Sequence, residues 1–224
     1  MKRVIVTGST GMVGKGVLLE CLESPYIAQI LVVNRSSVNI KHPKLKEVLL
    51  NDFMQIDTVF EELKGYDACF HCMGVSAMGM SEVQYTHVTY DMTKKLVDIL
   101  FDLNPEFTFN YVSGTGTDST EKGRTMWARV KGKTENMIFT KGFLDAYAFR
   151  PGAIVPEKGI KSRTSWYQFF YIILRPFFPL MKRSKNITTT TNIGIAMIRS
   201  ILEPIELKIL FNKDINALAT KEGM

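Results

Sequence analysis

Three glycines near the start of the chain have a spacing that could hold a phosphate group. Gly8, Gly11 and Gly14 directly follow the apolar run Val4–Val6 and precede an apolar pattern of helical period. The first glycine permits a tight turn, the second lets the backbone approach a pyrophosphate, and the third lets a helix pack close to the strand. The helix N-terminus then offers free N–H groups. The pattern predicts a dinucleotide site, with a purely structural turn as the alternative.

The end of the second predicted strand distinguishes the two nicotinamide cofactors. Asn34 and Arg35 follow the apolar run Ile30–Val33, and neither is a carboxylate. An NAD site usually has Asp or Glu here for the ribose 2′-hydroxyl, whereas an Arg accommodates the 2′-phosphate of NADP. Arg35 can hold that phosphate with two charge-assisted hydrogen bonds. We therefore expect NADP(H) rather than NAD(H), unless Arg35 is an ordinary surface residue.

Alternating patterns of strand and helix indicate the fold that would position these residues. Parallel strands need connections of helix length, and short continuous apolar runs are typical of a sheet buried on both faces. We predict a doubly wound α/β fold with a Rossmann-like parallel sheet, and an edge strand at Leu207–Phe211. The apolar runs are Val4–Val6, Ile30–Val33, Val48–Leu50, Ala68–Phe70, Phe107–Val112 and Tyr147–Phe149.

Composition narrows the class of protein. The 224 residues are 46% hydrophobic and 22% charged, which is typical of a globular chain and excludes disordered or collagen-like classes. A single domain is expected at this length. Three cysteines do not make a disulfide scaffold, and no apolar run has the length of a signal peptide core or a membrane span. We expect a reduced, cytoplasmic protein.

The net charge of +6 is concentrated in one segment. Residues 157–185 hold seven Lys or Arg, one Glu and seven of the 24 aromatic residues, and the rest of the chain has 21 cations and 21 anions. We expect residues of about 155–190 to form a small substrate-side cap. A contact of residues 158–185 with an anionic membrane surface or a partner protein is the alternative. Nucleic acid is not expected, because no binding motif accompanies the cations.

Several motifs recur in one order along nearly the whole chain. They are Thr7–Gly14, Asn34-Arg35, Asp52, Ser113 and Arg150-Pro151-Gly152. Together they resemble the atypical short-chain dehydrogenase/reductases, and most of all their NAD(P)-binding, epimerase-like group. The resemblance implies a dinucleotide-binding Rossmann fold with a catalytic Ser, Tyr and Lys. In that family the Tyr is the acid/base, the Lys lowers its pKa and holds the nicotinamide ribose, and the Ser orients the carbonyl.

This chain departs from the family at one catalytic position. Ser113 matches the serine and Lys131 matches the lysine, but Trp127 stands where the tyrosine is expected. An indole N–H donates a hydrogen bond and has no usable acidity near neutral pH. Loss of a positioned general acid typically lowers a rate by about 10²–10⁴. We expect a site of Ser113, Lys131 and Trp127, with Trp127 shaping the pocket and turnover altered or weak.

Two other patterns are weighed against the same fold. Tyr90 and Lys94 form a literal Y-x-x-x-K, but this pair precedes the fifth strand whereas the family's pair follows it, so we expect a chance match; Tyr90 could still supply the missing hydroxyl. Cys69 and Cys72 form a C-x-x-C motif within the fourth apolar run, where they would point to opposite faces of the sheet. A core strand is expected there, and no metal site.

These observations lead to one hypothesis and one rival. The first is an NADP(H)-binding oxidoreductase or epimerase-like protein that acts on a small carbonyl or alcohol, with catalysis altered by Trp127. The rival is a non-catalytic NADP(H)-binding module that senses redox state or docks on a membrane or partner. The expected cofactor contacts are Gly8, Thr10, Gly11, Met12, Val13, Gly14, Asn34, Arg35, Asp52, Phe53, Met73, Gly74, Val75, Lys131 and Ile154.

Overall fold

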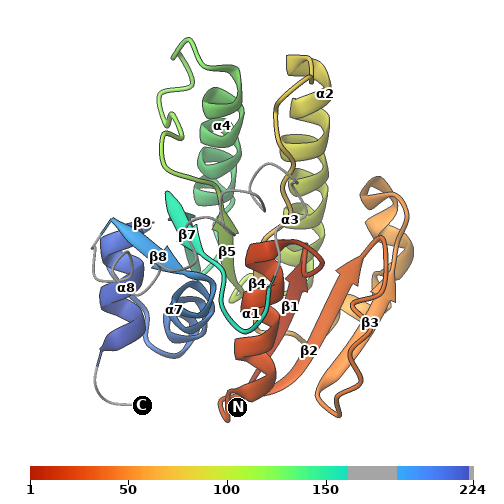
Figure 1. The fold of residues 1–224 in the computed structure, drawn as a ribbon. Helices are drawn as coiled ribbons and strands as arrows, with labels where there is room; N and C mark the ends of the chain where they lie inside the picture. The colour runs from red at the N-terminus through yellow and green to blue at the C-terminus, as the bar shows by residue number, and fades with distance from the viewer. Residues whose placement is uncertain (161–185, 222–224) are drawn as a thin grey trace.

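The computed structural model describes residues 1–160 and 186–221, and its centre is a seven-stranded parallel sheet (Figure 1). The strands are β1 (Lys2–Thr7), β2 (Ile27–Asn34), β3 (Leu45–Leu49), β4 (Ala68–His71), β5 (Thr108–Val112), β6 (Asp145–Arg150) and β9 (Ile209–Phe211). Their order is β3-β2-β1-β4-β5-β6-β9, and every neighbouring pair is parallel. The predicted doubly wound α/β fold is confirmed, with its switch point between β1 and β4, where such sheets bind ligands.

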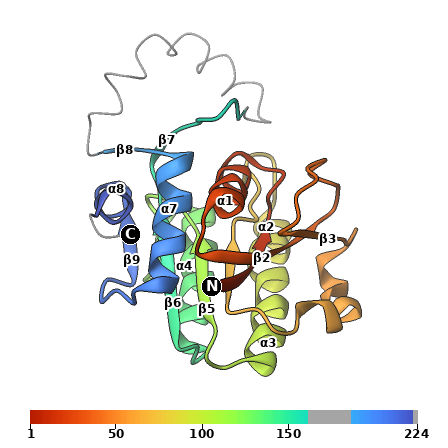
Figure 2. The same ribbon diagram turned by 90° about the horizontal axis from the view of Figure 1, so that it is seen from below.

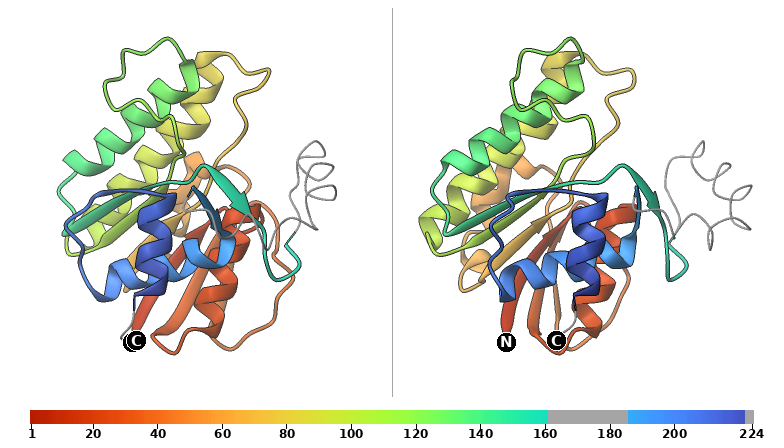
Figure 3. Two further views of the ribbon diagram at one scale, coloured as in Figure 1. Left: turned by 60° about the vertical axis from the view of Figure 1, so that its left-hand side comes forward. Right: turned by 90° about the vertical axis from the view of Figure 1, so that its left-hand side faces the viewer.

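Helices cover both faces of this sheet. On one face α1 (Met12–Glu23) lies beside α7 (Thr190–Leu202), with α8 (Asn212–Thr220) next to them (Figure 2). On the other face α3 (Met92–Leu103) packs beside α4 (Met126–Thr140) (Figure 3). A π-helical turn, η3 (His87–Asp91), joins α3 to the short α2 (Glu82–Thr86). Because all seven strands are parallel, their carboxyl ends lie together at one edge of the sheet, between the two layers of helices.

The pleat of the strands divides the core into two apolar clusters. Val4 and Val6 face the cluster under α1 and α7, whereas Ile5 between them faces the cluster under α3. Cys69 of β4 belongs to the second cluster, and the half-buried Cys72 directly after this strand packs against the first, so the two cysteines lie on opposite faces of the sheet. This confirms the core interpretation of that motif.

Some connections differ from what the sequence pattern predicts. Residues 35–44 link β2 to β3 without a helix, and Val38 and Ile40 pack against the core there. Between β3 and β4 there are two 3₁₀ helices, η1 (Phe53–Val59) and η2 (Glu61–Leu63). A separate two-stranded parallel sheet pairs β7 (Ala153–Val155) with β8 (Ile187–Thr189). The edge strand predicted at Leu207–Phe211 is present as β9, whereas the three-residue strands β7 and β8 were not predicted.

The basic aromatic segment lies almost entirely outside the described residues. Residues 161–185 are not described, so the expected cap over about 155–190 and the expected contact through 158–185 remain predictions. Lys158, in the described first part of this segment, forms ion pairs with Glu20 and Glu23 of α1, at 2.6 Å and 2.7 Å. Among the described residues no helix has both the length and the apolar character needed to cross a membrane.

Candidate active site

The glycine loop between β1 and α1 has the geometry of a phosphate cradle. Gly8 has φ +68°, and a Cβ on it would lie 2.6 Å from the carbonyl oxygen of Cys72. A Cβ on Gly14 would collide with the carbonyl oxygen of Gly8. The Gly11 N–H closes the turn by donating to that same oxygen at 2.9 Å, and Gly11 is the N-cap of α1. Gly8 and Gly14 thus allow the tight turn and the close helix packing that their spacing predicts.

The N-terminus of α1 presents backbone N–H groups without side-chain acceptors at this loop. No side chain caps this twelve-residue helix, so its first N–H groups have no side-chain acceptor among the described residues. Backbone N–H groups at a helix N-terminus and the helix dipole favour an anion. The loop therefore fits a diphosphate: it combines a close backbone approach, free donors and a position beside the switch point of the sheet.

Asn34 supports this loop from the neighbouring strand. Its Oδ1 accepts the Ser9 N–H at 3.2 Å, and its Nδ2 donates to Ser9 Oγ at 2.7 Å. Asn34 is buried, whereas Arg35 directly after it is exposed and forms no ion pair within the described part of the chain. The structure thus places Asn34 as a brace for the glycine loop and leaves the Arg35 guanidinium available at its side.

The other expected contacts lie along the same edge of the sheet in varied environments. Asp52 is exposed, and its carboxylate caps η1 by accepting the Met54 N–H at 2.8 Å. Phe53 is buried in the core cluster below α3, so its ring is not free to lie against an adenine. Gly74 and Val75 are exposed after β4, and nothing lies within 4 Å of a Cβ on Gly74. Half-buried positions are Thr10, Met12, Val13, Met73 and Ile154.

Helix α4 presents three functional side chains at successive turns. Trp127, Lys131 and Glu135 are four residues apart and therefore lie on one face of the helix. Lys131 Nζ donates to the backbone carbonyl of Ser113, and Ser113 Oγ donates to Glu135 Oε1 at 2.5 Å. Ser113 follows β5 directly, so the structure brings the predicted serine and lysine together. The serine is 5% exposed, and its hydroxyl proton is held by the carboxylate.

Glu135 belongs to a buried ion pair that joins α4 to the end of β6. Arg150 Nη2 lies 2.5 Å from Glu135 Oε2, and Arg150 Nε lies 3.0 Å from Glu135 Oε1. The Glu135 side chain is fully buried and that of Arg150 nearly so. Arg150 also donates to the Ser119 hydroxyl. Sequence analysis missed Glu135, although its place one helical turn after Lys131 was a usable signal.

Lys131 has an unusual electrostatic environment for a lysine. Burial lowers the pKa of its ammonium to about 8, and the nearby Glu135 carboxylate offsets this only in part. Both oxygens of Glu135 are already bonded to Arg150, so the nearest partner of Lys131 is a neutral carbonyl. A lysine that titrates near neutral pH is suited to move a proton.

The loop after Ser113 brings a further hydroxyl to this region. Thr115 is exposed, and its Oγ1 donates to the Arg150 carbonyl at 3.0 Å. A Cβ on the neighbouring Gly116, which has φ +91°, would lie 3.1 Å from Trp127 Cη2, so the indole packs against this loop. Thr115 therefore lies beside the predicted site, and the sequence did not single it out, because it belongs to no recognised motif.

Tyr90 does not face Lys131. Its ring lies under the ammonium of Lys133, 4.4 Å from Nζ to the ring centroid. Lys133 and Lys131 are about 200° apart around helix α4, since each residue turns the helix by about 100°. Lys94, the other member of the Y-x-x-x-K match, pairs with Asp98 at 2.6 Å. The packing supports the expectation that this motif is a chance match.

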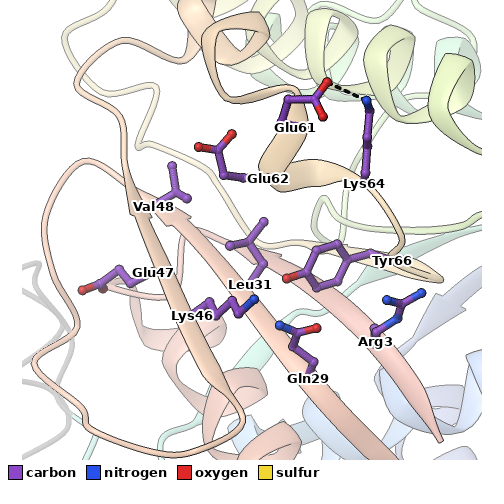
Figure 4. Close-up of a pocket in the computed structure, with 10 residues that line it drawn as sticks. All are labelled: Arg3, Gln29, Leu31, Lys46, Glu47, Val48, Glu61, Glu62, Lys64 and Tyr66. Carbon is purple, nitrogen blue, oxygen red and sulfur yellow. Dashed lines mark hydrogen bonds and ion pairs between the residues drawn. The ribbon is translucent and has the colours of Figure 1, made fainter.

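A hollow of about 600 Å³ lies away from this site (Figure 4). Arg3 and Gln29 on its floor belong to the starting halves of β1 and β2, and Glu61 and Lys64 border it from the η2 region. The glycine loop and Lys131 are at the opposite ends of the strands. Within the described residues no group of three His, Cys, Asp or Glu side chains could hold a metal ion.

Comparison with known families identifies the chain. Residues 4–126 match the NAD dependent epimerase/dehydratase family. The chain belongs to this family. The match begins in β1, includes the glycine loop, and ends at the start of α4. The resemblance to the epimerase-like group is thereby confirmed. The match includes the glycine loop and Ser113, whereas Lys131, the rest of α4 and the C-terminal elements lie beyond the matched residues.

Individual proteins are also similar to this chain. Protein HTATIP2 of Rattus norvegicus is 22% identical over 96% of this chain and 88% of its own length. The Bordetella bronchiseptica enzyme WbmF, solved in complex with NAD+ and UDP, has a TM-score of 0.69 at 16% identity, over 98% of this chain and 76% of that one. A short-chain dehydrogenase/reductase from Saccharomyces cerevisiae has a TM-score of 0.68 at 14% identity, over 98% of both chains. At these identities the solved structures bear on the fold alone.

Proposed function

We propose that this epimerase/dehydratase family member is an NADP(H)-binding oxidoreductase that acts on a small carbonyl or alcohol through Lys131. The observation that carries the proposal is the half-buried Lys131 ammonium at the end of β5, on the same edge of the sheet as the glycine loop. A bound nicotinamide would supply or accept the hydride. The side chains of this chain must then hold the cofactor, orient the substrate and move one proton.

Arg35 supports the choice of NADP(H). Its exposed guanidinium follows β2, where the ribose 2′-substituent of a dinucleotide lies in this fold class. Asn34 is engaged with Ser9 and cannot turn outward, so it offers no competing contact. WbmF is a neighbour solved with NAD+, so the 2′-phosphate preference rests on the side chain of this chain and not on that neighbour.

Lys131 is the proposed proton donor and acceptor. Trp127 has no acidic hydrogen to give, and the Tyr90 ring contacts Lys133. The hydroxyl proton of Ser113 is held by Glu135, so toward a ligand this serine can only accept a hydrogen bond. Lys131 donates and Ser113 accepts, an arrangement in which the lysine must protonate the oxygen of a reduced carbonyl, directly or through a water.

Cofactor titration tests the nucleotide part of the proposal. We expect NADPH to bind more tightly than NADH, and Arg35→Ala to weaken NADPH by about tenfold or more, the loss of a charged hydrogen-bonding pair. NADH affinity should not change. Arg3→Ala, another exposed arginine at the opposite end of β1, is the matched control. Tighter NADH binding by the wild type would refute the preference.

The rival proposal is an NADP(H)-binding module without turnover. The observation that favours it is Trp127 in the acid position with Tyr90 turned away. A panel of small aldehydes, ketones and alcohols, tested for hydride transfer under saturating cofactor, separates the two. Turnover that is abolished by Lys131→Met and retained by Lys133→Met supports the enzyme. Cofactor binding with no turnover on any panel member supports the module.

A further inference from the structure

We infer that the candidate site binds the reduced cofactor, whose nicotinamide ring is neutral, more tightly than the oxidised cofactor, whose ring is cationic, because Lys131 holds a positive charge at the end of β5 that its neighbours compensate only in part. The inference rests on the proposed function, since it requires a nicotinamide cofactor at this edge. It applies to the enzyme and to the module alike, because it concerns binding and not turnover.

The sheet order places the nicotinamide half of a dinucleotide near Lys131. A diphosphate on the glycine loop of β1 leaves the two halves of the molecule on either side of that strand. Arg35 follows β2 and marks the side of the 2′-phosphate and its adenosine. The other half must extend over β4 and β5, whose ends lie one and two strand spacings from β1, up to about 10 Å. Lys131 donates to Ser113 at the end of β5.

The charge on Lys131 is left without a partner by the ion pair beside it. Arg150 bonds both oxygens of Glu135, and the Ser113 hydroxyl takes a further position on Oε1. The half-buried Lys131 and the buried Glu135 and Arg150 therefore carry a net charge of +1 when the lysine is protonated. The only hydrogen bond of the Lys131 ammonium to the described residues goes to a neutral backbone carbonyl.

The residue at position 127 removes the group that could balance this charge. A tyrosine one turn before the lysine could ionise and form a neutral pair with it, whereas the indole of Trp127 remains uncharged. Two further acidic groups, one on β5 and one in the loop after it, do not replace it. Tyr111 is fully buried and burial raises the pKa of its phenol, so it stays protonated. The Asp118 carboxylate is bonded to Thr120 and Gly123 in the adjacent loop.

The Coulomb energy between two cations in such a site is large enough to be measured. At an effective dielectric constant of about 20, two unit charges about 10 Å apart repel each other by about three RT. The expected difference between the dissociation constants of oxidised and reduced cofactor is therefore about tenfold or more at pH 7 and low salt. Screening by solvent at the mouth of the site would bring it toward the lower value.

The test compares two ligands in four proteins. Dissociation constants for NADPH and NADP+ are measured by calorimetry at pH 7 in the wild type, Lys131→Met, Lys131→Arg and Lys133→Met. We expect the wild type, Lys131→Arg and Lys133→Met to prefer NADPH by about tenfold or more. Lys131→Met should bring the ratio close to one, chiefly through tighter binding of NADP+. Lys133 is an exposed lysine of the same helix and serves as the matched control.

The outcomes separate this inference from the proposal beneath it. Equal binding of the two forms by the wild type, or a ratio that Lys131→Met leaves unchanged, overturns the inference while the cofactor site stands. Binding of neither form overturns the proposed function and this inference with it. Lys131→Gln repeats the charge removal with a polar side chain, so the result does not depend on whether the methionine variant folds.

Discussion

Arg150 and Glu135 form a buried ion pair with two hydrogen bonds, at 2.5 Å and 3.0 Å, between the end of β6 and the inner face of α4. Ser113 adds a third bond to Glu135 from the end of β5. Two adjacent strand ends and the helix that carries Trp127 and Lys131 are therefore tied at one point. The positions of the site residues depend on this pair.

Removing one member of the pair should strongly destabilise the fold. Glu135→Leu leaves the Arg150 guanidinium buried without an anion, which typically costs about 3–5 kcal/mol of unfolding free energy. The double variant Glu135→Leu with Arg150→Met should recover much of that loss. Urea denaturation measures both. Glu61→Ala, which breaks the exposed pair with Lys64, is the control and should cost less than about 1 kcal/mol. Equal losses for Glu135→Leu and Glu61→Ala would contradict the prediction.

A side chain at Gly14 should disrupt the phosphate loop. A Cβ there would collide with the carbonyl oxygen of Gly8, so Gly14→Ala must separate the helix from the loop. We expect cofactor affinity to fall at least tenfold and unfolding free energy to decrease by about 1–3 kcal/mol, the range for overpacking. Gly74→Ala, where nothing lies within 4 Å of the added Cβ, is the control for stability. Unchanged cofactor binding by Gly14→Ala would remove the loop from the site.

Features of the fold that depend on a short local stretch of sequence could be predicted, whereas contacts between distant elements could not. The strands at Val4–Val6 and Ile30–Val33 are local apolar runs, so their existence was predictable and only their ends extended further. The roles of Gly8 and Gly14 depend on the loop alone and were predictable as well. For Glu135, its place one helical turn after Lys131 could be read from the sequence, but its pairing with Arg150 could not, because Arg150 is fifteen residues away on a different element.

The sequence also could not show which of the predicted site residues form hydrogen bonds or packing contacts with other residues of the chain. Asn34 matches a cofactor motif, yet its amide holds Ser9. Phe53 follows a strand end, yet its side chain is buried in the core cluster under α3. Ser113 matches a catalytic serine, yet its proton belongs to Glu135. Each is a matter of side-chain packing between elements distant in sequence, which motif spacing does not encode.

The depressed pKa of Lys131 makes a prediction about stability against pH. Its folded value of about 8 lies below the ordinary value of 10.5, so between these pH values the unfolded chain binds more protons than the folded one. The unfolding free energy therefore rises with pH across this window, and the penalty is complete below pH 8. Lys131→Met should be more stable than wild type by about 1–3 kcal/mol at pH 7, and the gain should disappear near pH 10.5. Lys133→Met controls for general alkaline effects, and a pH-independent gain would show that packing alone is responsible.

Substituting tyrosine at position 127 should raise turnover. The phenol would stand one helical turn before Lys131, where the cation lowers its pKa and makes it a usable acid. A positioned general acid is worth about 10²–10⁴ in rate, so Trp127→Tyr should increase kcat by a factor in that range on the best member of the carbonyl panel. Trp127→Phe introduces the ring of tyrosine without its hydroxyl and should give no increase in kcat. If both variants bind NADPH like the wild type and Trp127→Tyr is no faster than Trp127→Phe, the site lacks more than a proton donor. The chain would then be a binding module whose tryptophan is only one of the changes that removed catalysis.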